Sequence, residues 1–76
     1  MKHVEPDQAL GAAVRRLRSE RCMTQEALAR CTRVTVPTLC RLECGVYHPN
    51  WRTIRRIATG LGITLAELMT AVEACE

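Results

Sequence analysis

Residues 24–45 read TQEALARCTRVTVPTLCRLECG and contain two short segments whose apolar side chains recur at helical spacing. The first segment is expected to run from Thr24 to about Cys31, and the second from Thr35 to near Cys44. The side chains expected to face inward are Ala27, Leu28 and Cys31 in the first segment and Leu39 and Leu42 in the second. The stretch therefore predicts two short helices joined by a tight turn.

Each of these two helices begins with the same two local signals. Thr24 and Thr35 are good N-cap residues, because a hydroxyl oxygen accepts from a free backbone N–H of the first turn. The apolar pairs at the spacing of a hydrophobic staple are Met23 with Leu28 and Val34 with Leu39. Two capped helices with so short a connection cannot lie side by side antiparallel. They are expected to cross steeply, with the second helix forming a ridge that can enter a DNA major groove.

The order and spacing of these residues resemble the phage-repressor/Cro-like (XRE-type) helix-turn-helix family. The similarity lies in residues 24–29 (TQEALA), 34–35 (VT) and 39–45 (LCRLECG), and continues in Pro49 and in residues 53–54, 57–58 and 61–63. The resemblance covers most of the chain. It implies an all-α fold, a compact five-helix bundle of the lambda-repressor-like DNA-binding type, and a function in transcription.

Two positions depart from the family pattern, and both lie in turns. Cys22 stands where the family usually has a glycine that ends the first helix, and a residue with a side chain must accept or avoid a left-handed conformation there. Arg33 stands where the turn between the two helices usually carries glycine, at a cost of about 1 kcal/mol. The caps and staples on both sides are intact, so the motif is expected to hold.

The rest of the chain predicts three further helices and no strand. One begins at the cap Asp7 and runs to about Glu20, one runs from Trp51 to about Leu61 behind the cap Asn50, and one runs from a capping box at Thr64 to about Cys75. The residues expected to face inward are Leu10, Val14 and Leu17 in the first of these, then Ile54, Ile57, Ala58 and Leu61, then Leu68. Residues 1–6 are predicted to form a flexible arm ahead of a single domain, residues 7–76. Trp51 is interpreted as a partly buried prop under the preceding loop.

Charge is distributed unevenly along the chain, whose net charge is +3. All 11 Lys and Arg lie in residues 1–56, against five acids, whereas residues 57–76 hold three Glu and no base. This asymmetry favours an arrangement in which the basic part of the chain contacts nucleic-acid phosphate and the acidic end faces away from it. No apolar run approaches the roughly 20 residues of a membrane span. The N-terminus lacks a signal-peptide apolar region, so a cytoplasmic location is expected.

Candidate DNA contacts fall into two groups. The residues predicted to read bases lie on the outward side of the helix that follows Thr35 and are Val36, Pro37, Thr38, Cys40 and Arg41. Among them, Arg41 is the best candidate for contact with a guanine or a phosphate. The residues predicted to bind phosphate lie at helix starts and are Gln25, Thr35, Asn50 and Arg52. For Gln25, the family resemblance implies the same role. Glu43 is given a structural role, with an ion pair to an arginine that the sequence does not identify.

The five cysteines are expected to be free thiols, because the chain has no Cys-x-x-Cys pair and no export signal. A metal or redox site at Cys40, Cys44 and His48 is the weaker reading, because His48 lies beyond Gly45 in a loop. No catalytic constellation is present in the sequence. No enzymatic activity, metal or cofactor is therefore expected.

The predicted function is that of a sequence-specific transcriptional regulator that binds a palindromic operator on double-stranded DNA as a homodimer. The dimer interface is predicted on the last helix, which carries apolar residues and no base, at Leu65, Met69 and Val72. The alternative is an antitoxin or other protein-interaction subunit, with a toxin or another partner protein and secondary DNA binding. A thiol- or metal-responsive switch is a third hypothesis.

Overall fold

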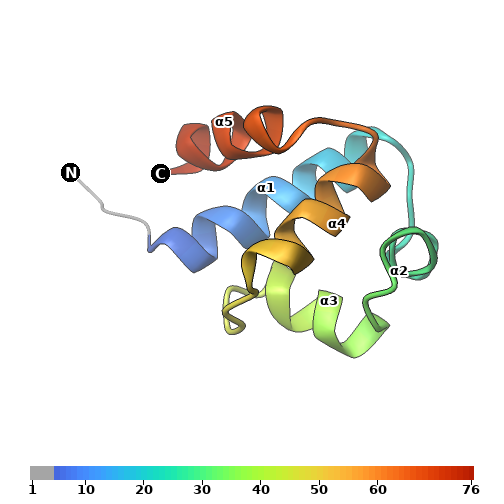
Figure 1. The fold of residues 1–76 in the computed structure, drawn as a ribbon. Helices are drawn as coiled ribbons and strands as arrows, with labels where there is room; N and C mark the ends of the chain where they lie inside the picture. The colour runs from blue at the N-terminus through green and yellow to red at the C-terminus, as the bar shows by residue number, and fades with distance from the viewer. Residues whose placement is uncertain (1–4) are drawn as a thin grey trace.

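A computed structural model describes residues 5–76, which form five α-helices and no strand (Figure 1). The helices are α1 (Pro6–Glu20), α2 (Gln25–Thr32), α3 (Val36–Glu43), α4 (Trp51–Leu61) and α5 (Leu65–Cys75). The all-α, five-helix prediction is confirmed. The predicted arm falls mostly on residues 1–4, which lie outside the described residues, and its last predicted member, Pro6, is instead the first residue of α1.

The start of α1 differs from the prediction, because Asp7 is not its cap. The N-cap is Glu5, which makes no side-chain capping hydrogen bond, and Pro6 follows it at the first helical position. Proline is suited to that position, since its fixed φ matches the helix and the missing N–H has no helical acceptor there. Asp7 lies within the first turn, where its negative charge still complements the helix dipole. It pairs with Nδ1 of His48 in the α3–α4 loop.

The other four helices begin as the sequence predicts. Each N-cap side chain accepts a hydrogen bond from the backbone N–H three residues further on. The pairs are Thr24 with Ala27 at 3.0 Å, Thr35 with Thr38 at 3.3 Å, Asn50 with Thr53 at 2.9 Å and Thr64 with Glu67 at 3.0 Å. Thr64 and Glu67 complete a reciprocal capping box. These caps supply partners for N–H groups that the helices cannot satisfy internally.

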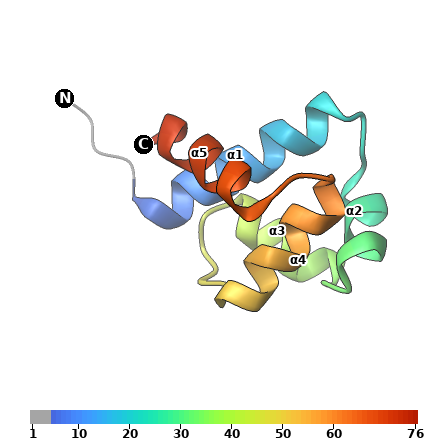
Figure 2. The ribbon, with the colours of Figure 1, turned by 45° about the horizontal axis from the view of Figure 1, so that its top comes forward.

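The core is built from aliphatic side chains of all five helices. Among the largest fully buried side chains are Val14, Leu28, Leu39, Leu42, Ile57 and Leu68. Helix α1 packs against α5 on one side and α3 on the other, while α2 packs against α4 (Figures 1 and 2). No single helix in the described chain has the length and composition of a membrane span; α4 and α5 reach both only as a pair bent by 100°.

One core prediction in α2 is wrong by a single position. Cys31, predicted to face inward, is exposed, whereas Thr32 is 2% exposed and takes the inward place. Both positions lie about one turn after Leu28, so spacing alone does not separate them. The Thr32 hydroxyl donates to the carbonyl of Ala29 and accepts from the N–H of Val34, which satisfies it inside the core.

Two backbone features position α3. The two non-glycine turn residues adopt the left-handed conformation that the resembled family assigns to glycine, with φ of 54° at Cys22 and 59° at Arg33. Gly11 of α1 lies where α1 crosses the end of α3, and a Cβ there would stand 2.4 Å from the carbonyl oxygen of Leu42. A side chain at position 11 would therefore force α3 away from α1.

Candidate nucleic-acid interface

The second helix of the predicted motif, α3, presents one exposed side and one buried side. Leu39 and Leu42 are at most 1% exposed and anchor α3 in the core. Pro37, Cys40 and Arg41 are exposed, as predicted for base-reading residues. The result is a short ridge with a rigid backing, in which Arg41 supplies the only cationic side chain of α3.

Two other predicted base-reading residues are less available than the sequence suggests. Val36 is half-buried and packs against the core cluster, so its placement on the outward side is only partly right. Thr38 is also half-buried, and its Oγ1 accepts a hydrogen bond from the Thr35 hydroxyl at 2.9 Å. Val34 and Leu39 both belong to the core cluster, as the predicted staple requires, and Val36 in the first turn of α3 packs against the same cluster.

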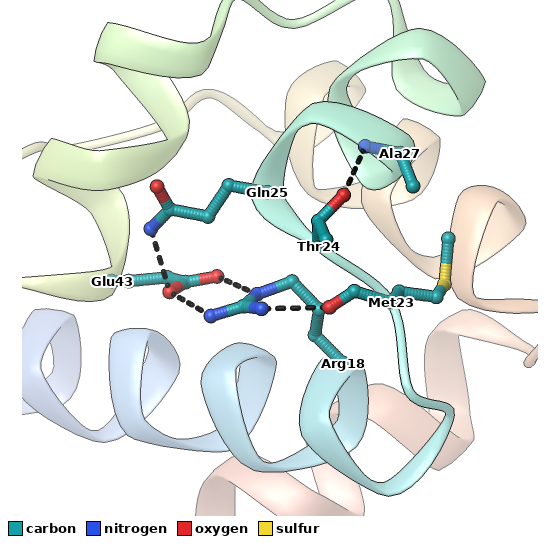
Figure 3. A network of polar contacts seen from close by, with 6 residues as sticks. All are labelled: Arg18, Met23, Thr24, Gln25, Ala27 and Glu43. Carbon is teal, nitrogen blue, oxygen red and sulfur yellow. Dashed lines mark hydrogen bonds and ion pairs between the residues drawn. The ribbon is translucent and has the colours of Figure 1, made fainter.

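The carboxylate of Glu43, at the end of α3, forms the centre of a polar network (Figure 3). Its Oε2 accepts from Nε of Arg18 at 2.8 Å, and its Oε1 accepts from Nη2 of the same residue at 3.0 Å. Arg18 also donates through Nη1 to the carbonyl oxygen of Met23 at 2.7 Å. The ion pair thereby ties α3 to α1 and to the connection that leads into α2.

The sequence predicted an ion pair between Glu43 and an arginine, and the structure identifies that arginine as Arg18. Arg18 lies among the arginines of α1 but does not belong to its exposed surface, since its side chain is only 15% exposed and that of Glu43 only 5%. The hydrogen bond to Glu43 raises the pKa of Arg18 above its ordinary value. Arg18 is therefore a structural cation and adds little to the basic surface.

Gln25 joins the same network from the first turn of α2. Its Nε2 donates to Oε1 of Glu43 at 3.0 Å, and the side chain points from α2 toward the end of α3 (Figure 3). An amide nitrogen carries two N–H donors, so one remains for a phosphate oxygen. The hydrogen bond to Glu43 fixes the direction of the amide group.

The remaining predicted phosphate residues lie at the starts of α3 and α4. The Thr35 hydroxyl is engaged twice, since it accepts from the Thr38 N–H and donates to the Thr38 hydroxyl. Asn50 uses its Oδ1 as the cap of α4, which leaves its amide nitrogen as a donor. Arg52 is exposed in the first turn of α4. Free N–H groups and a cation at one helix start make a suitable phosphate site.

Trp51 differs from its prediction. It was interpreted as a partly buried prop under the preceding loop, but it is 60% exposed at the first position of α4. It borders a groove between α2 and α4 that is lined by several arginines, including Arg52 and Arg55. The sequence carries one signal for this groove, because Arg52, Arg55 and Arg56 recur on the polar side of α4 at helical spacing.

The apolar residues of α5 divide between the core and the surface. Leu68 is fully buried, as the staple to Ile63 predicts. Met69 and Val72 are half-buried and pack against the core cluster, while Leu65 is 38% exposed. Leu65 is thus the most exposed of the three predicted interface residues.

The residues of the alternative metal hypothesis are not brought together into one site. His48 pairs with Asp7, and no group of three His, Cys, Asp or Glu side chains within residues 5–76 has an arrangement that could hold a metal ion. Cys40 and Cys44 are both exposed free thiols.

A short α2–α3 turn, a buried anchor on α3 and an exposed ridge on its other side define a helix-turn-helix domain. A sequence model of the family described as a helix-turn-helix domain matches residues 9–71, and the chain belongs to this family. The family predicted from the sequence is thereby confirmed.

Named relatives agree with this assignment. The "HTH-type transcriptional regulator DdrOP3" of Deinococcus deserti is 35% identical over 60 residues, which make up 79% of this chain and 46% of that protein. The chain thus spans about half the length of this curated relative. Two crystal structures of the clp gene regulator ClgR from Corynebacterium glutamicum are similar in fold, with TM-scores of 0.88 and 0.90 at 26% identity. The matches cover 95% and 96% of this chain and 94% and 78% of those chains.

Proposed function

We propose that this chain is a sequence-specific DNA-binding transcriptional regulator that inserts α3 into the major groove. The observation that carries the proposal is the exposed ridge of Pro37, Cys40 and Arg41 on a helix anchored by Leu39 and Leu42. A recognition helix must keep its position while it contacts base edges, and a buried anchor together with the Glu43 ion pair provides that rigidity.

The residues on the ridge differ in what they offer to DNA. Arg41 has a planar fork of donors that matches the two acceptors of guanine or a phosphate group. Pro37 cannot donate a hydrogen bond, but its ring can pack on a thymine methyl group. Thr38, half-buried beside Thr35, is the less accessible polar group. We therefore assign most of the base discrimination to Arg41.

Phosphate contacts at the flanking helix starts would set the position of α3 in the groove. We assign this role to Gln25, whose amide is oriented by Glu43, and to Asn50 and Arg52 at the start of α4. Contacts of this kind fix register and orientation but carry no sequence information. A regulatory role is supported by the relatives DdrOP3 and ClgR, which are both named as regulators.

We further propose that the chain binds DNA as a homodimer through α5. One recognition helix reads only a few base pairs, and a two-fold dimer doubles the site, with half-sites about 34–36 Å apart. The exposed Leu65 and the half-buried Met69 and Val72 form a continuous apolar face on a helix with no basic residue. Such a face suits a protein contact better than a phosphate backbone.

The test is a selection of bound duplexes from a random-sequence library, followed by titration of the selected and random duplexes at one fixed salt concentration. The proposal predicts a selected sequence with two-fold symmetry that binds at least about a thousandfold more tightly than random DNA. Equal affinity for both duplexes would contradict it. Equal affinity together with a stoichiometric co-purifying protein would favour the alternative, an antitoxin or other protein-interaction subunit.

A further inference from the structure

The groove between the end of α2 and the outer side of α4 has a volume of about 390 Å³. Helices α2 and α4 lie side by side in both views (Figures 1 and 2). Four arginines line the groove. Arg33 comes from the α2–α3 turn, and Arg52, Arg55 and Arg56 come from α4. No residue of α3 lines it, so the groove adjoins the proposed DNA-binding ridge without including it.

Positive charge is concentrated in this groove to an unusual degree. Its four arginines carry more charge than the net +3 of the whole chain. No acidic residue lines the groove, and none of the four arginines forms an ion pair within residues 5–76. Arg52 precedes Arg55 and Arg56 by three and four residues, so like charges face each other on one helical surface and repel. Anionic groups from outside the domain would relieve this repulsion.

Trp51 adds an apolar surface to the same groove. Its 60% exposure leaves much of the indole ring in contact with water at one end of the arginine row. Exposed Trp flanked by Arg is the composition found at the energetically dominant centres of protein–protein interfaces. A phosphodiester backbone offers no comparable apolar partner for the indole.

The walls of the groove are held at a fixed spacing by close helix packing. Gly60 of α4 lies against α2, and a Cβ at that position would stand 2.6 Å from Cγ2 of Thr32. The absence of a side chain at Gly60 is therefore what allows the two helices to approach. The groove is a preformed recess, which lowers the ordering cost of binding.

We propose that the α2–α4 groove docks an acidic polypeptide segment of a partner protein. Guanidinium forks bind carboxylates in a bidentate manner, and the indole of Trp51 would cover an apolar side chain of the same segment. Helix α4 has 11 residues and is therefore about 16 Å long. That length accommodates about five residues of extended chain or three turns of helix. The proposal is independent of sequence-specific DNA binding by α3.

Trp51 provides a direct probe, because it is the only tryptophan of the chain. The ligand is a synthetic peptide about as long as α4, composed of Asp and Glu with two leucines one helical turn apart and no tryptophan. The comparison peptide carries Asn and Gln in place of the acids. The proposal predicts a saturable change in Trp51 emission with the acidic peptide and none with the neutral one. No change with the acidic peptide would overturn it.

A pair of variants separates a specific groove from general attraction to a basic protein. Arg55→Gln with Arg56→Gln removes two charges from the groove, and Arg15→Gln with Arg16→Gln removes two exposed charges from α1. We expect the groove variant to bind the acidic peptide about tenfold more weakly and the α1 variant to change by less than about twofold. Equal losses would show that net charge alone attracts the peptide, and would overturn the proposal. Circular dichroism confirms that both variants are folded.

DNA and a second copy of the chain are the other possible occupants of the groove, and Trp51 emission tests both. Arg52 is shared with the proposed phosphate contacts, so the acidic peptide is expected to bind through Arg33, Arg55 and Arg56 when the protein is saturated with duplex DNA. The groove variant, which changes only Arg55 and Arg56, should keep the wild-type salt slope for DNA binding. Displacement of the peptide by DNA, or a slope reduced by about two units, would assign the groove to the phosphate backbone. A concentration-dependent Trp51 emission without peptide would assign it to self-association.

Discussion

The guanidinium of Arg18 binds the carboxylate of Glu43 side-on, with Nε 2.8 Å from Oε2 and Nη2 3.0 Å from Oε1. This bidentate pair joins the last turn of α1, the domain's longest helix, to the last residue of α3. Because Oε1 also accepts from Gln25, one carboxylate holds the proposed recognition helix and orients a proposed phosphate ligand. We therefore expect the stability of the fold and the proposed phosphate contact of Gln25 to be coupled through Glu43.

Replacing Glu43 by Ala is expected to lower the free energy of unfolding by about 3 kcal/mol, the lower end of the range for breaking a buried ion pair. The loss arises because Arg18 would be left largely buried without its counter-charge. Urea denaturation followed by circular dichroism measures it. Exchanging both partners for apolar residues, Arg18→Met with Glu43→Leu, should recover part of the loss. A loss below about 1 kcal/mol for Glu43→Ala would mean that the pair does not support the fold.

The capping box of α5 gives the stability a weak dependence on acid pH. Hydrogen bonds from Thr64, first from its backbone N–H, hold the pKa of Glu67 below its ordinary value of 4.5. A lowered folded-state pKa contributes stability that is present above 4.5 and is lost as the pH falls through the folded-state pKa. Glu67→Gln keeps an acceptor for the Thr64 N–H but does not titrate. The stability difference between wild type and Glu67→Gln should therefore shrink on acidification; a difference that stays constant would contradict this assignment.

Arg52 is expected to contribute affinity without specificity. Arg52→Ala should weaken binding to the selected and the random duplex by the same factor, because a phosphate contact is present on every sequence. The slope of log affinity against log salt should become flatter by about one unit. The measurement is a set of titrations over a range of salt concentrations. An unchanged slope would show that Arg52 does not contact phosphate.

The proposed dimer is tested most cleanly at Leu65, because Met69 and Val72 also pack against the core and their replacement by Asp would destabilise the monomer. Leu65→Asp adds a charge at the first position of α5, where the helix dipole tolerates an acid. Sedimentation equilibrium should show a folded monomer for this variant and a dimer for wild type at tens of micromolar. Ala66→Asp adds the same charge at the exposed neighbouring position and should stay dimeric. A monomeric wild type, or a dimeric Leu65→Asp variant, would remove α5 from the interface.

Features with local signals were predictable from the sequence. Four of the five caps follow from a Thr or Asn beside its own helix start, and the buried Leu39 and Leu42 follow from helical spacing. Apart from the cap of α1, where Glu5 and not Asp7 precedes the helix, the errors concern contacts between distant segments. Arg18 pairs with a residue 25 positions away, so nothing near it in sequence separates it from its exposed neighbours.

Trp51 and Thr32 show the same limit in the packing of side chains. The exposure of Trp51 depends on how α2 and α4 meet, and the burial of Thr32 depends on the space left by Gly60 of α4. Neither is encoded in the residues adjacent to Trp51 or Thr32. The candidate DNA residues follow from the motif and stay a prediction as a set, whereas the packing of Val36 against the core depends on the tertiary structure.

The central claim is that α3 reads DNA bases, and substitution of Arg41 tests it most directly. Titrations of the selected and random duplexes at one salt concentration are compared for wild type, Arg41→Ala and the charge-preserving Arg41→Lys. Arg41→Ala is predicted to weaken specific binding by about 1–3 kcal/mol. Arg41→Lys is predicted to keep the affinity for the random duplex but to lose most of the preference for the selected duplex, because lysine lacks the bidentate fork. A loss of specific affinity below about 0.3 kcal/mol for Arg41→Ala, with the preference for the selected duplex intact in both variants, would contradict the assignment of base reading to this residue and this side of α3.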